Sequence, residues 1–214
     1  MGLFVRNEHH NTDKAPLYSV GLTKTVLIVG LGNHGKEYDL TRHNVGFACL
    51  DHFADHNDFP QWVNKKDLKA ELSLFNLGDT RVILAKPTTF MNNSGEAIQA
   101  IQHYYKLPSS ATVIVHDEID IPFGQIRLRI GGGSAGHNGV KSLIEQGGEA
   151  TGRVRIGIAN EFSGQADSAD FVLGKFTTDE QKNFPALYQE VNAILTEYVY
   201  GSGALPTETR SYLA

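Results

Sequence analysis

The chain has 214 residues, of which 41% are apolar and 20% charged, and its net charge is −5. This composition is ordinary for one globular domain, or at most two small ones, with a core of its own. No apolar run approaches the about 18 residues of a membrane helix, and the acidic balance argues against a general nucleic-acid coat. The single cysteine, Cys49, excludes an internal disulfide and fits a reducing compartment. Within a predicted helix, it is expected to be a buried apolar residue rather than a nucleophile.

Positive charge is concentrated in residues 123–155, although the chain as a whole is acidic. Five basic residues against two acidic ones give this segment a charge of +3, which leaves −8 for the rest. A local basic patch suits a partner whose few phosphates are held in one place. Charge alone fits an ordinary solvated surface at least as well.

The first 24 residues contain no apolar core segment, so they are not predicted to be a secretory signal. They are also too acidic, with Glu8 and Asp13, and too poor in arginine for a good mitochondrial presequence. We therefore expect residues 1–24 to be a disordered leader and residues 25–214 to form the folded domain, with the cytoplasm as the default location.

Apolar periodicity predicts strands and helices that alternate along the chain. In chain order they are a strand at 26–29, a glycine turn at 30–35, a helix at 44–57, strands at 69–77 and 81–86, a helix at 97–105, strands at 112–115 and 125–130, a helix at 140–144, a strand at 154–158 and a closing helix at 187–198. Asn92, Asn93 and Ser94 are good N-cap residues for the helix that follows them. Thr177 and Glu180 have the spacing of a capping box.

The turn Gly78-Asp79 between two strands predicts a hairpin, so the sheet is partly antiparallel. The alternation predicts a single α/β domain with a mixed, partly antiparallel twisted sheet and helices on both faces. In such folds the site lies beyond the carboxyl ends of strands. The loops there carry Asn33, Asn92, Asp117 and Asn138, which we expect to share one site.

The turn Gly30-x-Gly32-x-x-Gly35 matches the dinucleotide-binding fingerprint. Its context disagrees, because residues 36–39 separate it from the predicted helix. The acidic residue that should end a second strand is also missing, since Asp51 lies within the helix. Nucleotide binding is therefore disfavoured.

The stretch Gly132-x-Ser134-x-Gly136 matches a nucleophile elbow. No histidine follows His137, so the residue order of an α/β-hydrolase fails. Another order with His43 as the base remains open, and a small-ester serine hydrolase stays an alternative. The competing interpretation is a flexible glycine turn whose backbone N–H groups face a ligand.

The stretch Asp117-Glu118-x-Asp120 could bind a metal ion. On a strand, however, Asp117 faces away from His116 and Glu118, so three ligands do not converge. A carboxylate that meets a distant histidine is the better interpretation.

Taken together, the sequence resembles bacterial-type peptidyl-tRNA hydrolases. The matching blocks follow the family's order from about residue 25 to about residue 200: Leu27–Asn33 with Gly35, Tyr38 with Thr41–Asn44 and Gly46, Lys86–Asn92 with Ser94 and Gly95, His116–Glu118 with Asp120, Gly131–Gly133 with Gly136–Gly139, Arg153 with Arg155–Ile158, and Phe171–Gly174.

Two residues depart from the family's pattern. His34 stands where the family usually has a proline, which would fix φ beside Asn33. Ala135 stands where a further glycine is frequent.

The resemblance implies hydrolysis of the ester between a peptide and the 3′ ribose of tRNA. It implies His43 as the general base for water, a task that suits histidine near neutral pH. Asp117 then orients His43 and stabilises its charged form. Asn33 and Asn92 lie at the ester, where an uncharged amide can both donate and accept hydrogen bonds.

The resemblance also implies the contacts with the rest of the substrate. Asn138 holds the peptide main chain with His137 beside it, and Tyr38 and Phe90 contact the tRNA end. Three arginines match positions that grip tRNA phosphates: Arg127, Arg129 and Arg155.

No cofactor, metal ion or membrane is implied, and we expect a monomer. The remaining rival is an RNA-binding relative without hydrolase activity. The presence of His43, Asp117 and the three asparagines at positions 33, 92 and 138 argues against it.

Overall fold

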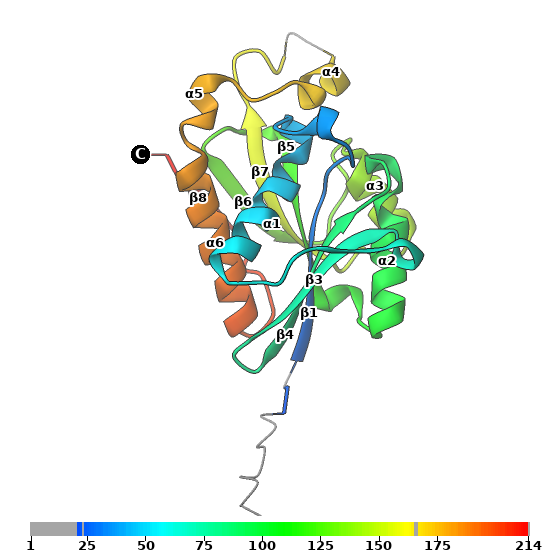
Figure 1. The fold of residues 1–214 in the computed structure, drawn as a ribbon. Coiled ribbons are helices and arrows are strands. Elements are labelled where there is room, and N and C mark those ends of the chain that lie inside the picture. Colours follow the sequence, from blue (N-terminus) through cyan, green and yellow to red (C-terminus); the bar gives the residue numbers. More distant parts are fainter. Residues whose placement is uncertain (1–20, 23, 165–166, 214) are drawn as a thin grey trace, which may run out of the picture.

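The computed structural model describes residues 21–22, 24–164 and 167–213, so most of the predicted leader lies outside it. One sheet of eight strands crosses the molecule in the order β2-β3-β4-β1-β5-β7-β6-β8 (Figure 1). The strands are β1 (Lys24–Gly30), β2 (Val63–Lys65), β3 (Ala70–Leu77), β4 (Thr80–Pro87), β5 (Thr112–Pro122), β6 (Gln125–Ile130), β7 (Gly152–Ala159) and β8 (Glu208–Ser211). The α-helices are α1 (Val45–His56), α2 (Ser94–Tyr105), α3 (Asn138–Glu145), α4 (Ser168–Leu173), α5 (Thr178–Gln181) and α6 (Phe184–Tyr200). The 3₁₀ turns are η1 (Lys36–Tyr38), η2 (Arg42–Asn44), η3 (Lys66–Leu68), η4 (Met91–Asn93) and η5 (Ser109–Ala111).

The sheet is mixed, as predicted. Its centre is parallel, because β1 pairs with β4 and β5, and β5 pairs with β7. Both edges are antiparallel, and the predicted hairpin is formed by β3 and β4. The carboxyl ends of the parallel strands therefore meet at one edge of the sheet, where a site is expected.

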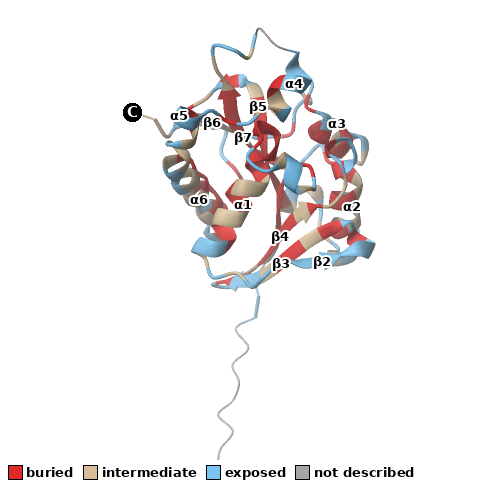
Figure 2. Cartoon of the chain, turned by 45° about the horizontal axis from the view of Figure 1, so that its top comes forward, coloured by how far each residue is buried: buried red, intermediate tan, exposed pale blue. Residues whose placement is uncertain are grey.

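Helices cover both faces of the sheet (Figures 1 and 2). On one face, α1 and α6 pack against side chains such as Ile28 and Val115; on the other, α2 and α3 pack against side chains such as Val29 and Ile114. Neighbouring residues such as Ile28 and Val29 lie on opposite faces because successive side chains of a strand alternate between the two faces of the sheet. Cys49 lies in the core between the sheet and α1, where burial raises the pKa of its thiol, so the expectation of a buried cysteine is confirmed.

Close backbone contact sets the position of α1. A Cβ on Gly46, in the first turn of α1, would collide with the carbonyl oxygens of Val115 and Leu31. Only glycine lets this turn lie directly between the ends of β1 and β5. As a result, the η2 turn just before α1, which carries His43, is held over the carboxyl edge of the sheet.

Several details differ from expectation. Of the three candidate N-cap residues of α2, Asn93 occupies the N-cap position, but its side chain makes no capping hydrogen bond; Asn92 lies in the η4 turn. No helix opens inside the glycine turn that resembles a dinucleotide fingerprint, because η1 follows it and α1 begins only at Val45. The predicted capping box of Thr177 and Glu180 is present at α5.

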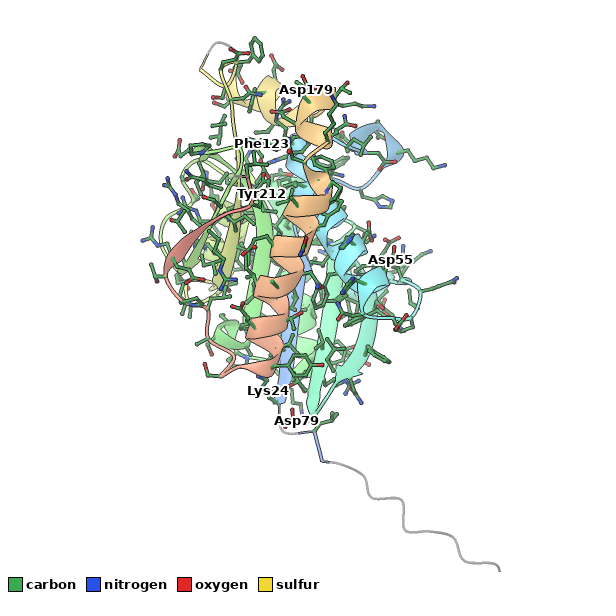
Figure 3. The ribbon with its side chains drawn as sticks, turned by 90° about the vertical axis from the view of Figure 1, so that its left-hand side faces the viewer. Lys24, Asp55, Asp79, Phe123, Asp179 and Tyr212 are labelled. Atoms are coloured by element: carbon green, nitrogen blue, oxygen red, sulfur yellow. The ribbon has the colours of Figure 1, made fainter. Side chains whose placement is uncertain are left out.

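Viewed from the side, α6 spans the length of the sheet (Figure 3). Lys24 and Asp79 mark the end where β1 starts, and Asp179 lies toward the opposite end, where the cavity described below is found. None of the helices in the described ranges is both long and apolar enough to cross a membrane.

Candidate active site

A cavity of about 720 Å³ lies at the carboxyl edge of the parallel strands. The loops after β1 and β4, the strand β5 itself, the loop before α3 with the start of α3, and one side of α4 line it. Asp117 was expected in a loop after a strand but lies within β5. All four residues that were expected to share a site are in this lining: Asn33, Asn92, Asp117 and Asn138. His43 lines it too.

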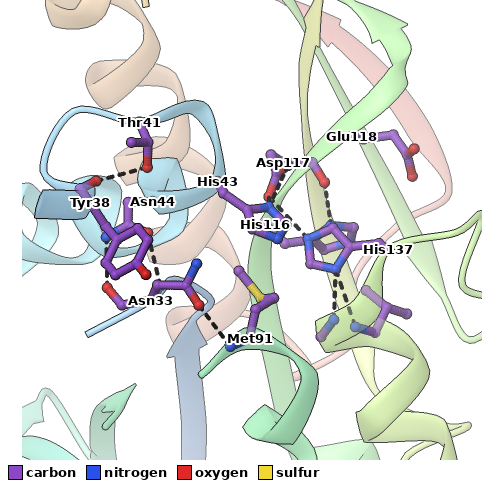
Figure 4. A network of polar contacts seen from close by, with 12 residues as sticks. Asn33, Tyr38, Thr41, His43, Asn44, Met91, His116, Asp117, Glu118 and His137 are labelled. Carbon is purple, nitrogen blue, oxygen red and sulfur yellow. Dashed lines mark hydrogen bonds and ion pairs between the residues drawn. The ribbon is translucent and has the colours of Figure 1, made fainter. Parts of the chain in front are cut away.

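A buried hydrogen bond joins Asp117 and His43 beside this cavity (Figure 4). The Nδ1 atom of His43 lies 2.9 Å from Oδ2 and 3.0 Å from Oδ1 of Asp117. His43 is 7% exposed and Asp117 only 1%. Burial alone would raise the pKa of Asp117, but the two adjacent histidines, His137 and His43, outweigh burial and hold this pKa well below its ordinary value. Asp117 is therefore a carboxylate throughout the neutral range.

His137 is the second partner of Asp117, with Nε2 3.0 Å from Oδ1. Its other nitrogen, Nδ1, caps α3 and accepts hydrogen bonds from the backbone N–H groups of Gly139 at 3.1 Å and Val140 at 3.3 Å. Because Nδ1 accepts, the proton of a neutral His137 must be on Nε2, which donates to Asp117. Both ring nitrogens of His137 are thus occupied, one by Asp117 and one by the first turn of α3.

These hydrogen bonds determine the tautomer of His43. An ionised Asp117 can only accept, so Nδ1 of His43 carries a proton and donates it to the carboxylate. The lone pair of the neutral ring is then on Nε2, which makes no hydrogen bond within the described part of the chain. A histidine held in this way at a cavity can accept a proton from water.

The ligand atoms of His43, Asp117 and His137 also lie within 4.8 Å of one another, as in a metal site. Their arrangement is that of a hydrogen-bonded network, since each ring nitrogen that faces Asp117 donates a proton to it. A metal ion would have to displace both protons and the bonds they make.

Asn33 is held by three hydrogen bonds that leave one end of its amide free. Its backbone N–H donates to Oδ1 of Asn44 at 2.8 Å, and Nδ2 of Asn44 donates to the backbone carbonyl of Asn33 at 2.9 Å. The Met91 N–H donates to Oδ1 of Asn33 at 2.8 Å. Nδ2 of Asn33 therefore remains as a donor at the cavity. Sequence reasoning missed the role of Asn44, although its position directly after His43 in the matched motif was a signal.

The other predicted substrate contacts surround the cavity to different degrees. Asn92 and Asn138 are exposed and line it, as does Phe90, which is 61% exposed. Tyr38 lies in η1, half-buried and outside the lining. Ser134 is also outside the lining, and its side chain makes no hydrogen bond to any described histidine.

The predicted phosphate-binding arginines differ in their surroundings. Arg155 is paired with the buried carboxylate of Glu118, with Nη2 3.0 Å and Nε 3.1 Å from Oε2. In the described part of the chain, Arg127 and Arg129 have no ion-pair partner. They are the more available cations for phosphate.

One wall of the cavity was not predicted. It comes from α4, which contributes Ala169, Val172 and Leu173. The buried guanidinium of Arg42, next to His43, lies 4.4 Å from the ring of Phe171 in α4 and forms an ion pair of 2.9 Å with Glu180. The contact between Arg42 and Phe171 therefore holds α4 against the η2 turn, which carries both Arg42 and His43.

His116 provides a prediction about stability. Burial, together with His137, lowers the pKa of His116 well below its ordinary value, so the folded protein keeps this ring neutral while the unfolded chain protonates it below about pH 6.5. Unfolding then takes up a proton, and stability is lost as the pH falls. Urea unfolding measures the free energy of unfolding at pH 7 and at pH 5.5. Between these two pH values, the free energy of unfolding of wild type should fall by about 1 kcal/mol more than that of His116→Asn. The exposed His103→Asn should behave as wild type, and equal losses in all three proteins would contradict the prediction.

Comparison with known proteins agrees with this geometry. A family model described as peptidyl-tRNA hydrolase matches residues 27–210. The peptidyl-tRNA hydrolase of Levilactobacillus brevis is 42% identical over 177 residues, which are 82% of this chain and 94% of the relative. The chloroplastic peptidyl-tRNA hydrolase of Arabidopsis thaliana is 43% identical over 165 residues, 76% of this chain and 56% of the relative.

Among solved structures, the crystal structure of peptidyl-tRNA hydrolase from Acinetobacter baumannii is similar to this chain with a TM-score of 0.72 and 35% identity. The similarity covers 82% of this chain and 90% of that one. The resemblance predicted from the motifs is confirmed: the chain belongs to the peptidyl-tRNA hydrolase family.

Proposed function

We propose that this protein hydrolyses the ester bond that joins a peptide, or an N-blocked aminoacyl group, to the 3′ end of tRNA. It thereby recycles tRNA from peptidyl-tRNA that is released prematurely in translation. The observation that carries the proposal is the His43–Asp117 pair at a cavity where Asn33 has a free amide donor. Membership of the family supports the choice of substrate.

The reaction requires a base for water and a donor for the developing oxyanion. Nε2 of His43 takes a proton from water as the water oxygen attacks the ester carbonyl, and Asp117 stabilises the resulting imidazolium. In this proposal Nδ2 of Asn33 donates to the carbonyl oxygen, an interaction whose removal costs about 3 kcal/mol in other enzymes. The proton then passes from His43 to the departing ribose oxygen.

The asparagines suit a substrate whose peptide varies in sequence. Such an enzyme can bind only the ester and the peptide main chain, and an amide can donate and accept without a charge to desolvate. Asn92, exposed at the cavity, contacts the ester or the water in this proposal. Asn138, at the start of α3, holds the peptide main chain.

The tRNA binds at its 3′ end and through its phosphates. Phe90 presents an exposed ring at the cavity on which a base can stack, and Tyr38 is the second aromatic residue proposed for that end. Arg127 and Arg129 bind phosphates without reading the sequence. Arg155 contributes less charge because Glu118 neutralises it.

The two rival functions predict different outcomes in one assay. Wild type should release N-acetylphenylalanine from N-acetylphenylalanyl-tRNA in the presence of a chelator, and Ser134→Ala should retain this activity. Loss of activity in Ser134→Ala would favour a serine esterase. An absence of turnover with intact binding would indicate an RNA-binding protein, and inhibition by the chelator would indicate a metal at His43, Asp117 and His137.

Arg129→Ala should raise KM for the tRNA substrate more than it lowers kcat, because a phosphate contact positions tRNA and does no chemistry. The logarithmic dependence of binding on salt should become less steep by about one unit. Titrations from low to high salt measure this slope, with Lys66→Ala, an exposed lysine of η3, as the control. Binding of wild type that does not depend on salt would contradict the proposed phosphate contacts.

We further propose that residues 25–214 form the catalytic domain, that the protein acts as a monomer and that it works in the cytoplasm. Light scattering at micromolar concentration tests the oligomeric state.

A further inference from the structure

Four arginines of β6 and β7 share one face of the sheet, and two of them, Arg127 and Arg129, are the proposed phosphate contacts. The antiparallel register places Arg127 of β6 opposite Arg155 of β7, and Arg129 opposite Arg153. Sequence alone cannot separate their tasks, because all four occupy alternate positions of two strands. Their surroundings do separate them, since Arg129 is exposed whereas Arg153 is only 3% exposed.

The guanidinium of Arg153 is bonded to the glycine loop, residues 131–136. Its Nη1 donates to the carbonyl oxygen of Gly133 at 2.6 Å, and its Nη2 donates to that of Gly132 at 2.7 Å. Hydrogen bonds from a charged donor are shorter and stronger than neutral ones. A buried guanidinium whose two terminal nitrogens are engaged in this way is not displayed to a phosphate.

The loop needs such an anchor. Gly131, Gly132 and Gly136 have positive φ angles of 65°, 95° and 80°, and Ala135 has a φ of 48°, so the segment is neither strand nor helix. Its backbone hydrogen bonds lie toward its two ends, from Gly131 N–H to the Thr151 carbonyl at 3.1 Å and from His137 N–H to the Ser134 carbonyl at 2.9 Å. The carbonyls between them need other partners. Arg153 provides hydrogen bonds to two of them.

The same loop leads directly into two residues of the proposed active site. His137 follows it, donates to Asp117 and caps α3. Asn138 comes next and lines the cavity. A displacement of the loop therefore moves the histidine that holds Asp117 and the asparagine proposed to bind the peptide.

Arg129 lies on the outside of this loop. A Cβ built on Gly132 would come within 2.5 Å of Cζ of Arg129, so the Arg129 guanidinium packs directly against Gly132. The loop thus contacts both Arg153, which binds its carbonyl oxygens, and Arg129, which is exposed.

We propose that Arg153 is a positioning residue that holds the glycine loop so that His137 and Asn138 reach the catalytic cavity, and that it does not bind tRNA phosphate. This inference rests on the proposed function and deepens it. Arg153 acts on the peptide end of the substrate through the loop, whereas Arg129 acts on the tRNA end.

Two substrates distinguish these roles: N-acetylphenylalanyl-tRNA, and the N-acetylphenylalanyl ester of the trinucleotide CCA, which lacks the acceptor stem. Arg153→Met should lower kcat by about tenfold to a hundredfold on both substrates, because a small misplacement of reacting groups has this cost. Its KM for the tRNA substrate and its salt slope should match wild type. Arg153→Lys keeps the charge but cannot reach both carbonyls as a planar fork does, so it should recover only part of kcat.

Arg129→Met is the comparison variant, and its largest effect should be a raised KM for the tRNA substrate, with a smaller change of kcat on either substrate than in Arg153→Met. Hydrogen exchange gives a readout independent of activity: backbone amides of residues 132–138 should exchange faster in Arg153→Met than in Arg129→Met. A raised KM for tRNA alone with a reduced salt slope in Arg153→Met would overturn the proposal and make Arg153 a phosphate ligand. Wild-type kcat in Arg153→Lys would also overturn it, and this variant decides the matter if Arg153→Met does not fold. Inactivity of wild type on both substrates would instead refute the proposed function.

Discussion

Asp117→Asn should lower kcat by about 10⁴-fold, the loss seen when the corresponding aspartate of a serine protease triad is changed in this way. The reason lies in the hydrogen bonds of His137. The Gly139 and Val140 N–H groups require His137 Nδ1 to accept, so its Nε2 must donate. An asparagine has a single side-chain oxygen, which His137 Nε2–H will occupy.

The NH₂ group of the new asparagine then faces Nδ1 of His43. Nδ1 must become an acceptor, and the ring proton moves to Nε2, the atom that has to take a proton from water. The loss should therefore appear in kcat, with KM for the tRNA substrate close to wild type. Steady-state kinetics measure both constants, and Asp55→Asn, an exposed aspartate of α1, is the matched control. A kcat within tenfold of wild type would show that Asp117 does not set the tautomer.

His43→Ala should lower kcat by about 10²- to 10⁴-fold, the usual contribution of a positioned general base. Substrate binding should persist, because Asn33, Asn138 and the arginines remain in place. Single-turnover hydrolysis with enzyme in excess measures the chemical step, and the exposed His56→Ala serves as the control. Unchanged single-turnover hydrolysis in His43→Ala would assign the base to another residue.

The central strands and main helices could be predicted because burial imposes a pattern on sequence. The apolar run Val26–Val29 became β1, and the alternation in residues 125–130 became β6. Strands β2 and β8 could not be predicted, because their sequences, Val-Asn-Lys and Glu-Thr-Arg-Ser, carry no apolar pattern. They are edge strands whose formation depends on a neighbour: among the described residues, β8 pairs with β6 alone and β2 with β3 alone.

The parts of the site that could be predicted are those that lie at the ends of strands or in the motifs that carry the family resemblance. The convergence of Asn33, Asn92 and Asp117 follows from the parallel strands β1, β4 and β5, whose carboxyl ends share an edge. Asn138 follows the antiparallel strand β6 and reaches the same cavity through the glycine loop. Even the direction of Asp117 was predictable, because alternation along β5 turns it away from Glu118 toward His43. Glu118 instead meets Arg155.

What could not be predicted depends on contacts between distant segments. The bond from His137 to Asp117 exists because the glycine loop turns back over β5, which no local pattern reports. The same holds for Arg153, whose partners are backbone carbonyls with no sequence signature. The α4 wall was missed because a helix of six residues is too short to display a helical period.

The pH dependence of kcat/KM tests most directly the claim that His43, held by Asp117, removes a proton from water. For wild type on N-acetylphenylalanyl-tRNA, kcat/KM should fall about tenfold per pH unit on the acid side, the limb expected of a reaction that requires one general base. Asp117 stays ionised in this range, so it adds no second limb. In His43→Ala the residual kcat/KM should show no such acid limb. An acid limb of the same slope and position in His43→Ala would contradict the account, because the group that loses its proton for catalysis would then be another residue.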